Sequence, residues 1–309
     1  MTPFDILVAG EINPDLILSG DVVPSFGQVE KLVDSASLNV GSSSVIFACG
    51  VARLGLKVAF VGVCGEDVFG WFMLEEMEKR GVNISNVIRV PSGQTGLTVI
   101  LNTTTDRAML THVGLIAALQ ADDVPDHLLT QARHLHVASY FLQTALQPGL
   151  PDLFRRARAL GLTTSLDTNW DPAEQWTGVR ELLPLTDVFL PNEAEARALT
   201  GITTPRAAAK HLAAQAGVVA VKRGAEGALG VQGDRVVEVS SIPIQLVDTV
   251  GAGDTFDAGF VYGFLQGWNL ETCLRLGAVC GALSTEKPGG TDGQPGLVVA
   301  TRYLGKREV

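Results

Sequence analysis

Short apolar runs alternate with amphipathic helical patterns along almost the whole chain of 309 residues. Several runs are apolar without interruption, as strands covered on both faces should be, and most helical patterns end in glycine. Repeated strand–helix–strand order requires right-handed crossovers. The sequence therefore predicts an α/β fold with a mostly parallel central sheet flanked by helices. The predicted strands are 5–10, 58–65, 134–141, 163–169, 187–192 and 218–224.

Two regions interrupt this alternation with patterns typical of short hairpins. They cover residues 16–40 and 97–113, with a helix, a strand and another helix between them in the sequence. We expect them to form a small second sheet over the carboxyl edge of the main one. The prediction is a single domain, 1–309, with a β-sheet lid formed by about 12–40 and 95–114.

Composition and charge exclude several classes of partner. The chain is 46% apolar and has a net charge of −10, and no basic run stands out. Nucleic acid and membrane surfaces are therefore not expected partners. The N-terminus enters a strand pattern without a secretory signal, and the four cysteines form no CxxC pair. We expect a cytoplasmic protein.

The sequence DTVGAGDTFDAGF (248–260) places a flexible turn directly before a helical pattern. The amides in a helix's first turn lack intrahelical partners, and the macrodipole gives that end partial positive charge. Gly251 and Gly253 would let the backbone approach an anion closely. In an acidic protein, this turn is the predicted phosphate site.

Asp254 has two interpretations at this turn. It could accept the proton of an attacking hydroxyl, or it could simply cap the helix, a common use of aspartate. A dinucleotide site is disfavoured because GAGDTF lacks the third glycine of GxGxxG and lies near the C-terminal end. The sequence also contains no GxxxxGK[ST] motif.

Beyond this turn, the chain resembles the ribokinase-like (PfkB) family of carbohydrate kinases over almost its whole length. The resemblance is carried, in order, by GEINPD (10–15), VGSSSVIFACGVARLG (40–55), VGVCGEDVFG (61–70), LDTNW (166–170), LPNEAEA (190–196), VKRGAEGA (221–228), DTVGAGDTFDAGF and GALSTEKPGG (281–290).

This resemblance implies ATP-dependent phosphorylation of a hydroxyl, with Asp254 as general base. The amides of Gly251, Ala252, Gly253 and Asp254 would hold the transferring phosphoryl group. ATP would bind along Lys222, Gly224, Gly227 and Gly253. Taken alone, Lys222 would be interpreted as a solvated strand end.

The resemblance also implies two metal sites. Asn192 and Glu195 would orient Mg²⁺ through water, although two polar residues that open a helix can also be ordinary caps. A monovalent cation, K⁺, would lie beside Asp248 and the carbonyls near Gly289.

The acceptor substrate is expected near the start of the chain. Asn13 and Asp15 flank Pro14, so on an extended chain they point the same way and could bind neighbouring hydroxyls; a polar turn is the alternative. By resemblance, Gly41, Ser42 and Asn169 also belong to this site. The family's usual second glycine and asparagine are Ser42 and Ile46 here, and we hypothesise that Ile46 faces a substrate with fewer hydroxyls or with an apolar group.

Several functional interpretations remain open. The leading one is a sugar or sugar-acid kinase; the alternatives are a nucleoside kinase, a non-catalytic sugar or nucleotide sensor and, less supported, a nicotinamide oxidoreductase. A homodimer through the lid is expected because unpaired apolar strands seek partners. His134 and His136 alternate on a strand, but a packed strand is favoured over a metal site.

Overall fold

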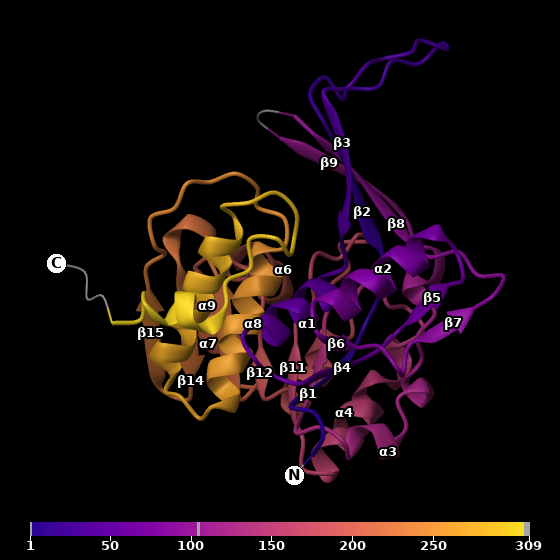
Figure 1. The fold of residues 1–309 in the computed structure, drawn as a ribbon. Coiled ribbons are helices and arrows are strands. Elements are labelled where there is room, and N and C mark those ends of the chain that lie inside the picture. Colours follow the sequence, from indigo (N-terminus) through magenta and orange to yellow (C-terminus); the bar gives the residue numbers. More distant parts are fainter. Residues whose placement is uncertain (1, 104–105, 306–309) are drawn as a thin grey trace.

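A nine-stranded sheet forms the centre of the molecule, in the order β15-β14-β13-β12-β11-β10-β1-β4-β6 (Figure 1). The structure is a computed structural model that describes residues 2–103 and 106–305. Every pair is parallel except β13–β14 and β14–β15, which are antiparallel. The strands are β1 (Ile6–Ala9), β4 (Val58–Val61), β6 (Val82–Asn83), β10 (His134–Val137), β11 (Thr163–Leu166), β12 (Val188–Phe189), β13 (Val218–Lys222), β14 (Ala228–Gln232) and β15 (Arg235–Val239).

Helices cover both faces of this sheet, as the sequence predicts. Leu7 and Val8 are both buried but belong to different apolar cores, because successive side chains of a strand point to opposite faces. The core around Val8 includes α1 (Ser43–Arg53), α2 (Val68–Lys79), α8 (Ala252–Leu265), α9 (Leu270–Ser284) and α10 (Leu297–Thr301). The core around Leu7 includes α3 (Asp126–Leu129), α4 (Leu150–Ala159), α5 (Val179–Leu182), α6 (Glu193–Thr200) and α7 (Pro205–Ala213).

Two details of the predicted sheet are wrong. The run 58–65 is two strands, because the chain leaves the main sheet at Gly62, where an added Cβ would lie 2.5 Å from the Gly10 carbonyl oxygen. Its second half, β5 (Val63–Gly65), pairs instead with β7 (Ile88–Val90). In addition, β6 and the hairpin β14–β15 were not among the predicted strands.

The second sheet has four strands in the order β3-β2-β8-β9. Each predicted hairpin region supplies an antiparallel pair, and the parallel pairing of β2 with β8 joins them. The strands are β2 (Pro14–Ser19), β3 (Ser35–Val40), β8 (Leu97–Asn102) and β9 (Arg107–His112). Figure 1 shows this sheet projecting from the main body, with the β2–β3 loop extending further. Residues 104–105 of the predicted lid, and positions 1 and 306–309 of the predicted domain, lie outside the described residues.

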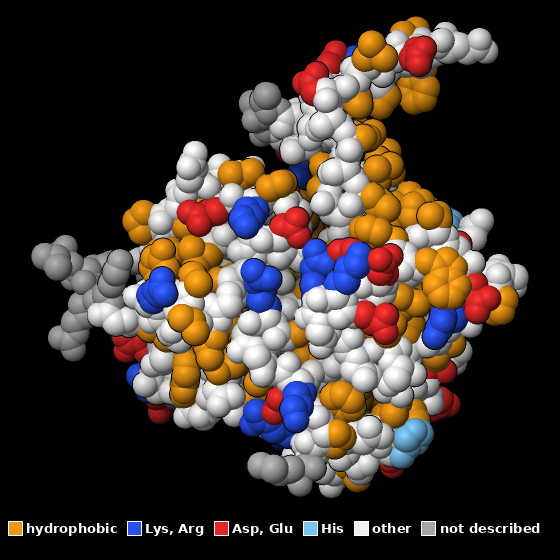
Figure 2. Space-filling view, viewed as in Figure 1, with side chains coloured by type: hydrophobic (Ala, Val, Ile, Leu, Met, Phe, Trp, Pro, Cys, Tyr) orange, Lys and Arg blue, Asp and Glu red, His pale blue; other side chains and the backbone are white. Residues whose placement is uncertain are grey.

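One face of the small sheet is apolar. Leu38, Leu16, Val99 and Leu110 lie opposite one another across the four strands, and so do Ala36, Leu18, Leu101 and Ala108. Residues paired in this way share a face. Hydrophobic side chains are visible along the projecting sheet in Figure 2.

The described residues contain no helix that is both long and apolar enough to cross a membrane. All four cysteines are buried and unpaired. His134 and His136 are buried as well, and their ring nitrogens contact hydroxyls of Thr163 and Ser165 at 2.7 Å. Both rings are thus packed on the strand, as favoured from the sequence, although His136 Nε2 has no hydrogen-bond partner among the described residues.

Candidate active site

The glycine turn starts helix α8 at the carboxyl edge of the main sheet. Gly251 caps the helix with φ 70°, in the left-handed region that favours glycine. A Cβ at this position would lie 2.8 Å from both the Cα and the carbonyl oxygen of Gly290. The turn therefore needs glycine both for its conformation and for the close approach of the 289–290 segment.

The first helix-type hydrogen bond of α8 runs from the amide of Thr255 to the carbonyl of Gly251, at 2.9 Å. The amides of Ala252, Gly253 and Asp254 precede it, at the positive end of the helix dipole. The Ala252 amide donates to the Thr249 carbonyl at 3.3 Å, so it is partly engaged within the turn. The local geometry fits an anion cup in which the Gly253 and Asp254 amides are the most available of the three.

Asp254 lies in the first turn of α8 and is partly buried. Desolvation, followed by the negative charge of Asp167, raises the pKa of its carboxyl to about 7, although Lys222 and a hydrogen bond from Ser43 act in the opposite direction. A carboxyl with this pKa can both accept and release a proton near neutral pH. Its side chain caps no amide of α8, which removes the capping interpretation for the described residues.

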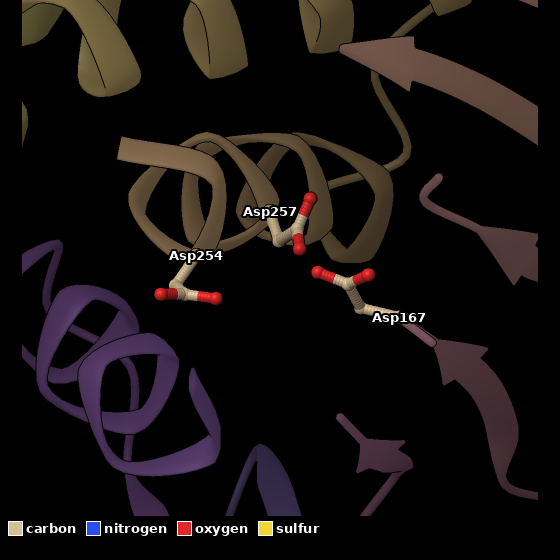
Figure 3. A group of neighbouring side chains, drawn as sticks. All are labelled: Asp167, Asp254 and Asp257. Carbon is tan, nitrogen blue, oxygen red and sulfur yellow. The ribbon is translucent and has the colours of Figure 1, made fainter. Parts of the chain in front are cut away.

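Beneath Asp254, two further carboxylates lie close together (Figure 3). Carboxylate oxygens of Asp167, Asp254 and Asp257 are within 4.8 Å of one another. Asp257 comes from the second turn of α8 and Asp167 from just beyond β11, and their carboxylates face each other. The Lys222 Nζ atom contacts both, at 2.7 Å from Asp167 and 3.0 Å from Asp257. Lys222 is therefore buried, and its interpretation as a solvated strand end is wrong.

A cavity of about 590 Å³ lies beside the glycine turn. Its wall includes all four residues of the predicted nucleotide site: Lys222, Gly224, Gly227 and Gly253. The rest of the wall is largely apolar and includes Ile242, Pro243, Leu246 and Phe256. Such a cavity, apolar along one side and bounded by a helix N-terminus, has the form expected for a planar base followed by phosphates.

Asn192 and Glu195 open helix α6 in a capping box. Asn192 Oδ1 accepts from the Glu195 amide at 2.9 Å, and Glu195 Oε2 accepts from the Asn192 amide at 2.8 Å. Glu195 is 4% exposed, and burial, followed by the charge of Asp167, raises its pKa to about 7. The positive charge of Lys222 lowers this pKa but does not offset burial, so the carboxylate is left short of positive charge. These oxygen donors therefore fit Mg²⁺, which would supply that charge, and the capping role is compatible with it.

Asp248 and Gly289 come together as predicted from the resemblance. One carboxylate oxygen of Asp248 accepts from the Val250 amide at 3.0 Å, and the other from the Gly289 amide at 2.9 Å. The carboxylate thus ties the glycine turn to the segment after α9. This arrangement accounts for Asp248 structurally, whether or not it also contacts a cation.

The acceptor side of the site is formed where the chain enters the small sheet. Asn13 and Asp15 are 5% and 8% exposed, and Asn13 Nδ2 lies 3.5 Å from the hydroxyl of Thr98 on β8. Burial, and then the charge of Asp254, raises the pKa of Asp15 to about 7. A Cβ on Gly41 would lie 2.3 Å from Asp15 Oδ1, so glycine leaves room for this carboxylate.

The three serines at the start of α1 have different roles. The Ser42 hydroxyl donates to Glu11 and accepts from the Val45 amide, so it caps the helix. Ser43 instead contacts the side chain of Asn169 and donates to Asp254. Ser43 was missed from the sequence because the run SSS gives no indication of which hydroxyl faces the site. The Asn169 side chain lies against Ser43 and Ser139, and the backbone amide of Asn169 donates to Asp167.

Glu11 was also missed. It is 2% exposed and accepts hydrogen bonds from Ser42, Ser44 and Ser139, which tie the end of β1 to the start of α1 and the end of β10. The hypothesis about Ile46 stays a prediction. That side chain is 3% exposed and packs beneath Gly251 and Gly290, so it also supports the glycine turn.

Comparison with known proteins agrees with this geometry. The family model described as pfkB family carbohydrate kinase matches residues 5–296. An uncharacterised sugar kinase of Archaeoglobus fulgidus is 33% identical over 80% of this chain and 98% of its own. The 2-dehydro-3-deoxygluconokinase of Bacillus subtilis is 32% identical over 85% of this chain and 86% of its own.

The fold has close counterparts among solved structures. The ribokinase of Arabidopsis thaliana, solved with ribose and ATP, superposes with a TM-score of 0.85 at 24% identity, over 99% of this chain and 100% of that one. The resemblance seen in the sequence is confirmed. This chain belongs to the pfkB family of carbohydrate kinases.

Proposed function

We propose that this kinase transfers the γ-phosphoryl group of ATP to a hydroxyl of a sugar or sugar acid, with Asp254 as general base. The observation that carries this proposal is the position of Asp254. Its carboxyl, with a pKa of about 7, lies at the N-terminus of α8 between the 590 Å³ cavity and the buried pair Asn13 and Asp15.

Each group of residues has its own role in the proposed reaction. Asp254 takes the proton of the acceptor hydroxyl while the hydroxyl oxygen forms a bond to the γ-phosphorus of ATP. The bond between the γ-phosphorus and the oxygen that bridges to the β-phosphate breaks, and ADP leaves. The amides of the Gly251–Asp254 turn stabilise charge on the transferring group. Asn13, Asp15, Gly41, Ser43 and Asn169 orient the acceptor.

ATP is assigned to the cavity lined by Gly224, Gly227 and Gly253. Mg²⁺ would be held by Asn192 and Glu195, through water, and would neutralise charge on the phosphates. For K⁺, Asp248 and the carbonyls near Gly289 remain the assigned site. Replacing KCl by tetramethylammonium chloride should then lower turnover.

A sugar acid is favoured over a neutral sugar by Arg107. This residue lies on β9 of the small sheet, and its guanidinium is 3.4 Å from the Thr249 hydroxyl in the glycine turn. It also lowers the pKa of Asp15, against the larger effect of burial, so its positive charge acts on the acceptor side. A carboxylate on the acceptor would pair with this guanidinium. The relationship to 2-dehydro-3-deoxygluconokinase supports the same class.

We also propose a homodimer through the apolar face of the small sheet. Leu110 and Leu38, at opposite edges of that face, are 60% and 36% exposed. Two rows of four apolar side chains form a continuous patch, and such patches usually mark an interface. A second copy would cover it with the same surface, as a twofold dimer requires.

The proposal is tested by ADP release from Mg·ATP across neutral sugars, sugar acids and nucleosides, with Asp254→Asn in parallel. Turnover on a sugar acid that falls by about 10³ in the variant is the expected result. Turnover on a nucleoside alone would replace the substrate class. ATP binding without turnover on any acceptor would favour a sensor, and turnover unchanged by the substitution would remove Asp254 from its role.

A further inference from the structure

Lys222, Asp167 and Asp257 form a buried ion triad beneath the candidate site. The side chains are 12%, 2% and 1% exposed, respectively. The Lys222 Nζ atom contacts Asp167 Oδ2 at 2.7 Å and Asp257 Oδ2 at 3.0 Å. Two of the three ammonium donors are thereby directed at carboxylates. Such a group is not free to follow a phosphate as a solvated lysine would.

The triad joins the three elements that meet under the glycine turn. Lys222 is the last residue of β13, Asp167 follows β11, and Asp257 lies in the second turn of α8. Asp257 is three residues after Asp254, so both project from one side of the helix (Figure 3). The Lys222 chain also runs under the first turn, because a Cβ on Gly253 would lie 3.6 Å from Nζ and 3.7 Å from Cδ.

Charge within the triad is balanced internally. Burial alone would lower the pKa of Lys222, but Asp167 and Asp257 outweigh it and raise the pKa, so the lysine stays charged. Burial opposes ionisation of Asp167 too, yet Lys222 and a hydrogen bond with Asp257 lower its pKa. Burial raises the pKa of Asp257 well above its usual value. These shifts favour a charged Lys222 paired with an ionised Asp167 and oppose ionisation of Asp257.

We propose that Lys222 is a positioning residue: it clamps Asp257 and Asp167 and so fixes Asp254 and the anion-cup amides against the strand ends. This inference rests on the proposed function. It assigns to Lys222 a different role from the ATP-phosphate ligand implied by the family resemblance, although its side chain lines the nucleotide cavity. A displacement of α8 of even about 1 Å is enough to cost roughly 10² in rate.

The first test separates clamping from phosphate binding by comparing kcat with KM for ATP. Asp257→Ala removes one anchor but leaves Lys222 paired with Asp167, so the protein should fold. In Asp257→Ala we expect kcat to fall about tenfold or more, while KM for ATP changes less than about threefold. Asp257→Asn keeps the shape of the side chain and should retain most of the wild-type kcat. Lys222→Met should likewise lower kcat and leave KM for ATP nearly unchanged, with a larger loss of kcat than in Asp257→Ala.

A second measurement distinguishes clamping from general structural damage. The groups that face Asp254 are Asp167 beyond β11, Lys222 from β13, Ser43 from α1, Glu11 after β1, Asp15 from β2, Glu195 from α6 and Asp257 from its own helix. Only Lys222 among them is positive. Its loss should therefore move the rising limb of the kcat/KM pH profile to higher pH, whereas damage alone would lower the amplitude without moving the limb.

The proposal would be overturned if Lys222→Met raised KM for ATP tenfold or more while Asp257→Ala kept wild-type activity. Lys222 would then be a phosphate ligand. If the wild-type protein phosphorylates no acceptor, the proposed function fails instead. Calorimetric titration with Mg·ATP then decides on Lys222: affinity within threefold of wild type in Lys222→Met supports the clamp, and a tenfold loss overturns it.

Discussion

Asp15 and Asp254 face each other across the candidate site, and the charge of Asp254 contributes to raising the pKa of Asp15 to about 7. One carboxyl belongs to β2 of the small sheet and the other to α8, so they come from parts of the chain more than two hundred residues apart. Both have pKa values of about 7, with burial as the largest cause. An acceptor that donates hydroxyls to both would relieve this unfavourable pairing.

The pH dependence of turnover follows from the raised pKa of Asp254. A general base must be unprotonated, so kcat/KM should fall as pH drops through about 7, far above the ordinary aspartate pKa of 3.8. In Asp15→Asn a neighbouring negative charge is lost, so the pKa of Asp254 should fall and the rising limb should move to lower pH. Initial rates between pH 5 and 9 provide the check. A limb at pH 4 in the wild type would contradict it.

Gly251 and Gly267 provide a matched pair for the glycine turn, since they flank α8 with φ values of 70° and 72°. An added Cβ at Gly267 meets nothing within 4 Å, whereas at Gly251 it meets Gly290 at 2.8 Å. Gly267→Ala should cost about 1 kcal/mol of unfolding free energy, from φ strain alone, and spare kcat. Gly251→Ala should cost more and lower kcat about 10²-fold. Urea unfolding and initial rates measure both; equal effects would contradict a special role for the turn.

Arg107→Gln should discriminate between acceptors. Loss of a charge-assisted hydrogen bond costs about 1.5–3 kcal/mol, so KM for a sugar acid should rise about 10–100-fold, while KM for a neutral sugar stays nearly constant. Arg155→Gln, on the surface of α4, removes the same charge elsewhere and should change neither constant. Equal rises for both acceptors in Arg107→Gln would show that the guanidinium supports the small sheet instead of binding a carboxylate.

The proposed dimer can be tested on a single strand. Met109 and Leu110 are adjacent on β9, 62% and 60% exposed, and point to opposite faces. Leu110→Lys places a charge in the apolar face and should yield monomers in analytical ultracentrifugation, whereas Met109→Lys should remain dimeric. A wild-type protein that sediments as a monomer at micromolar concentration would rule out this interface.

The alternation of patterns predicted the core of the main sheet and the existence of a second one, but not β6 or the hairpin β14–β15. It could not predict the end of β4, because Gly62 marks an approach to Gly10 that no local pattern reveals. The glycine turn was identified from its own residues, and the family resemblance added the site residues around it. Their roles remain predictions, since comparison identifies the family and not the function of each side chain.

The environments of individual residues were harder to predict than their positions. Lys222 appeared solvated when taken alone because its partners, Asp167 and Asp257, are 55 and 35 residues away in the sequence. Ile46 also supports the glycine turn, a contact that the sequence did not indicate. Ser43 could not be told from Ser42, because the difference depends on whether each hydroxyl faces Glu11 or Asp254.

The parallel pairing of β2 with β8 has a consequence for the order of folding. Its partners, such as Asp15 and Thr98, are separated by some eighty residues, so the pairing closes a long loop. The entropy cost of closing this loop is offset only once α1, β4 and α2, which lie between the two strands in the sequence, have packed together. During synthesis, Asn13 and Asp15 leave the ribosome first but gain their β8 neighbours only after residue 102 has emerged. The acceptor site would then be among the last parts of the N-terminal half to acquire protection from hydrogen exchange.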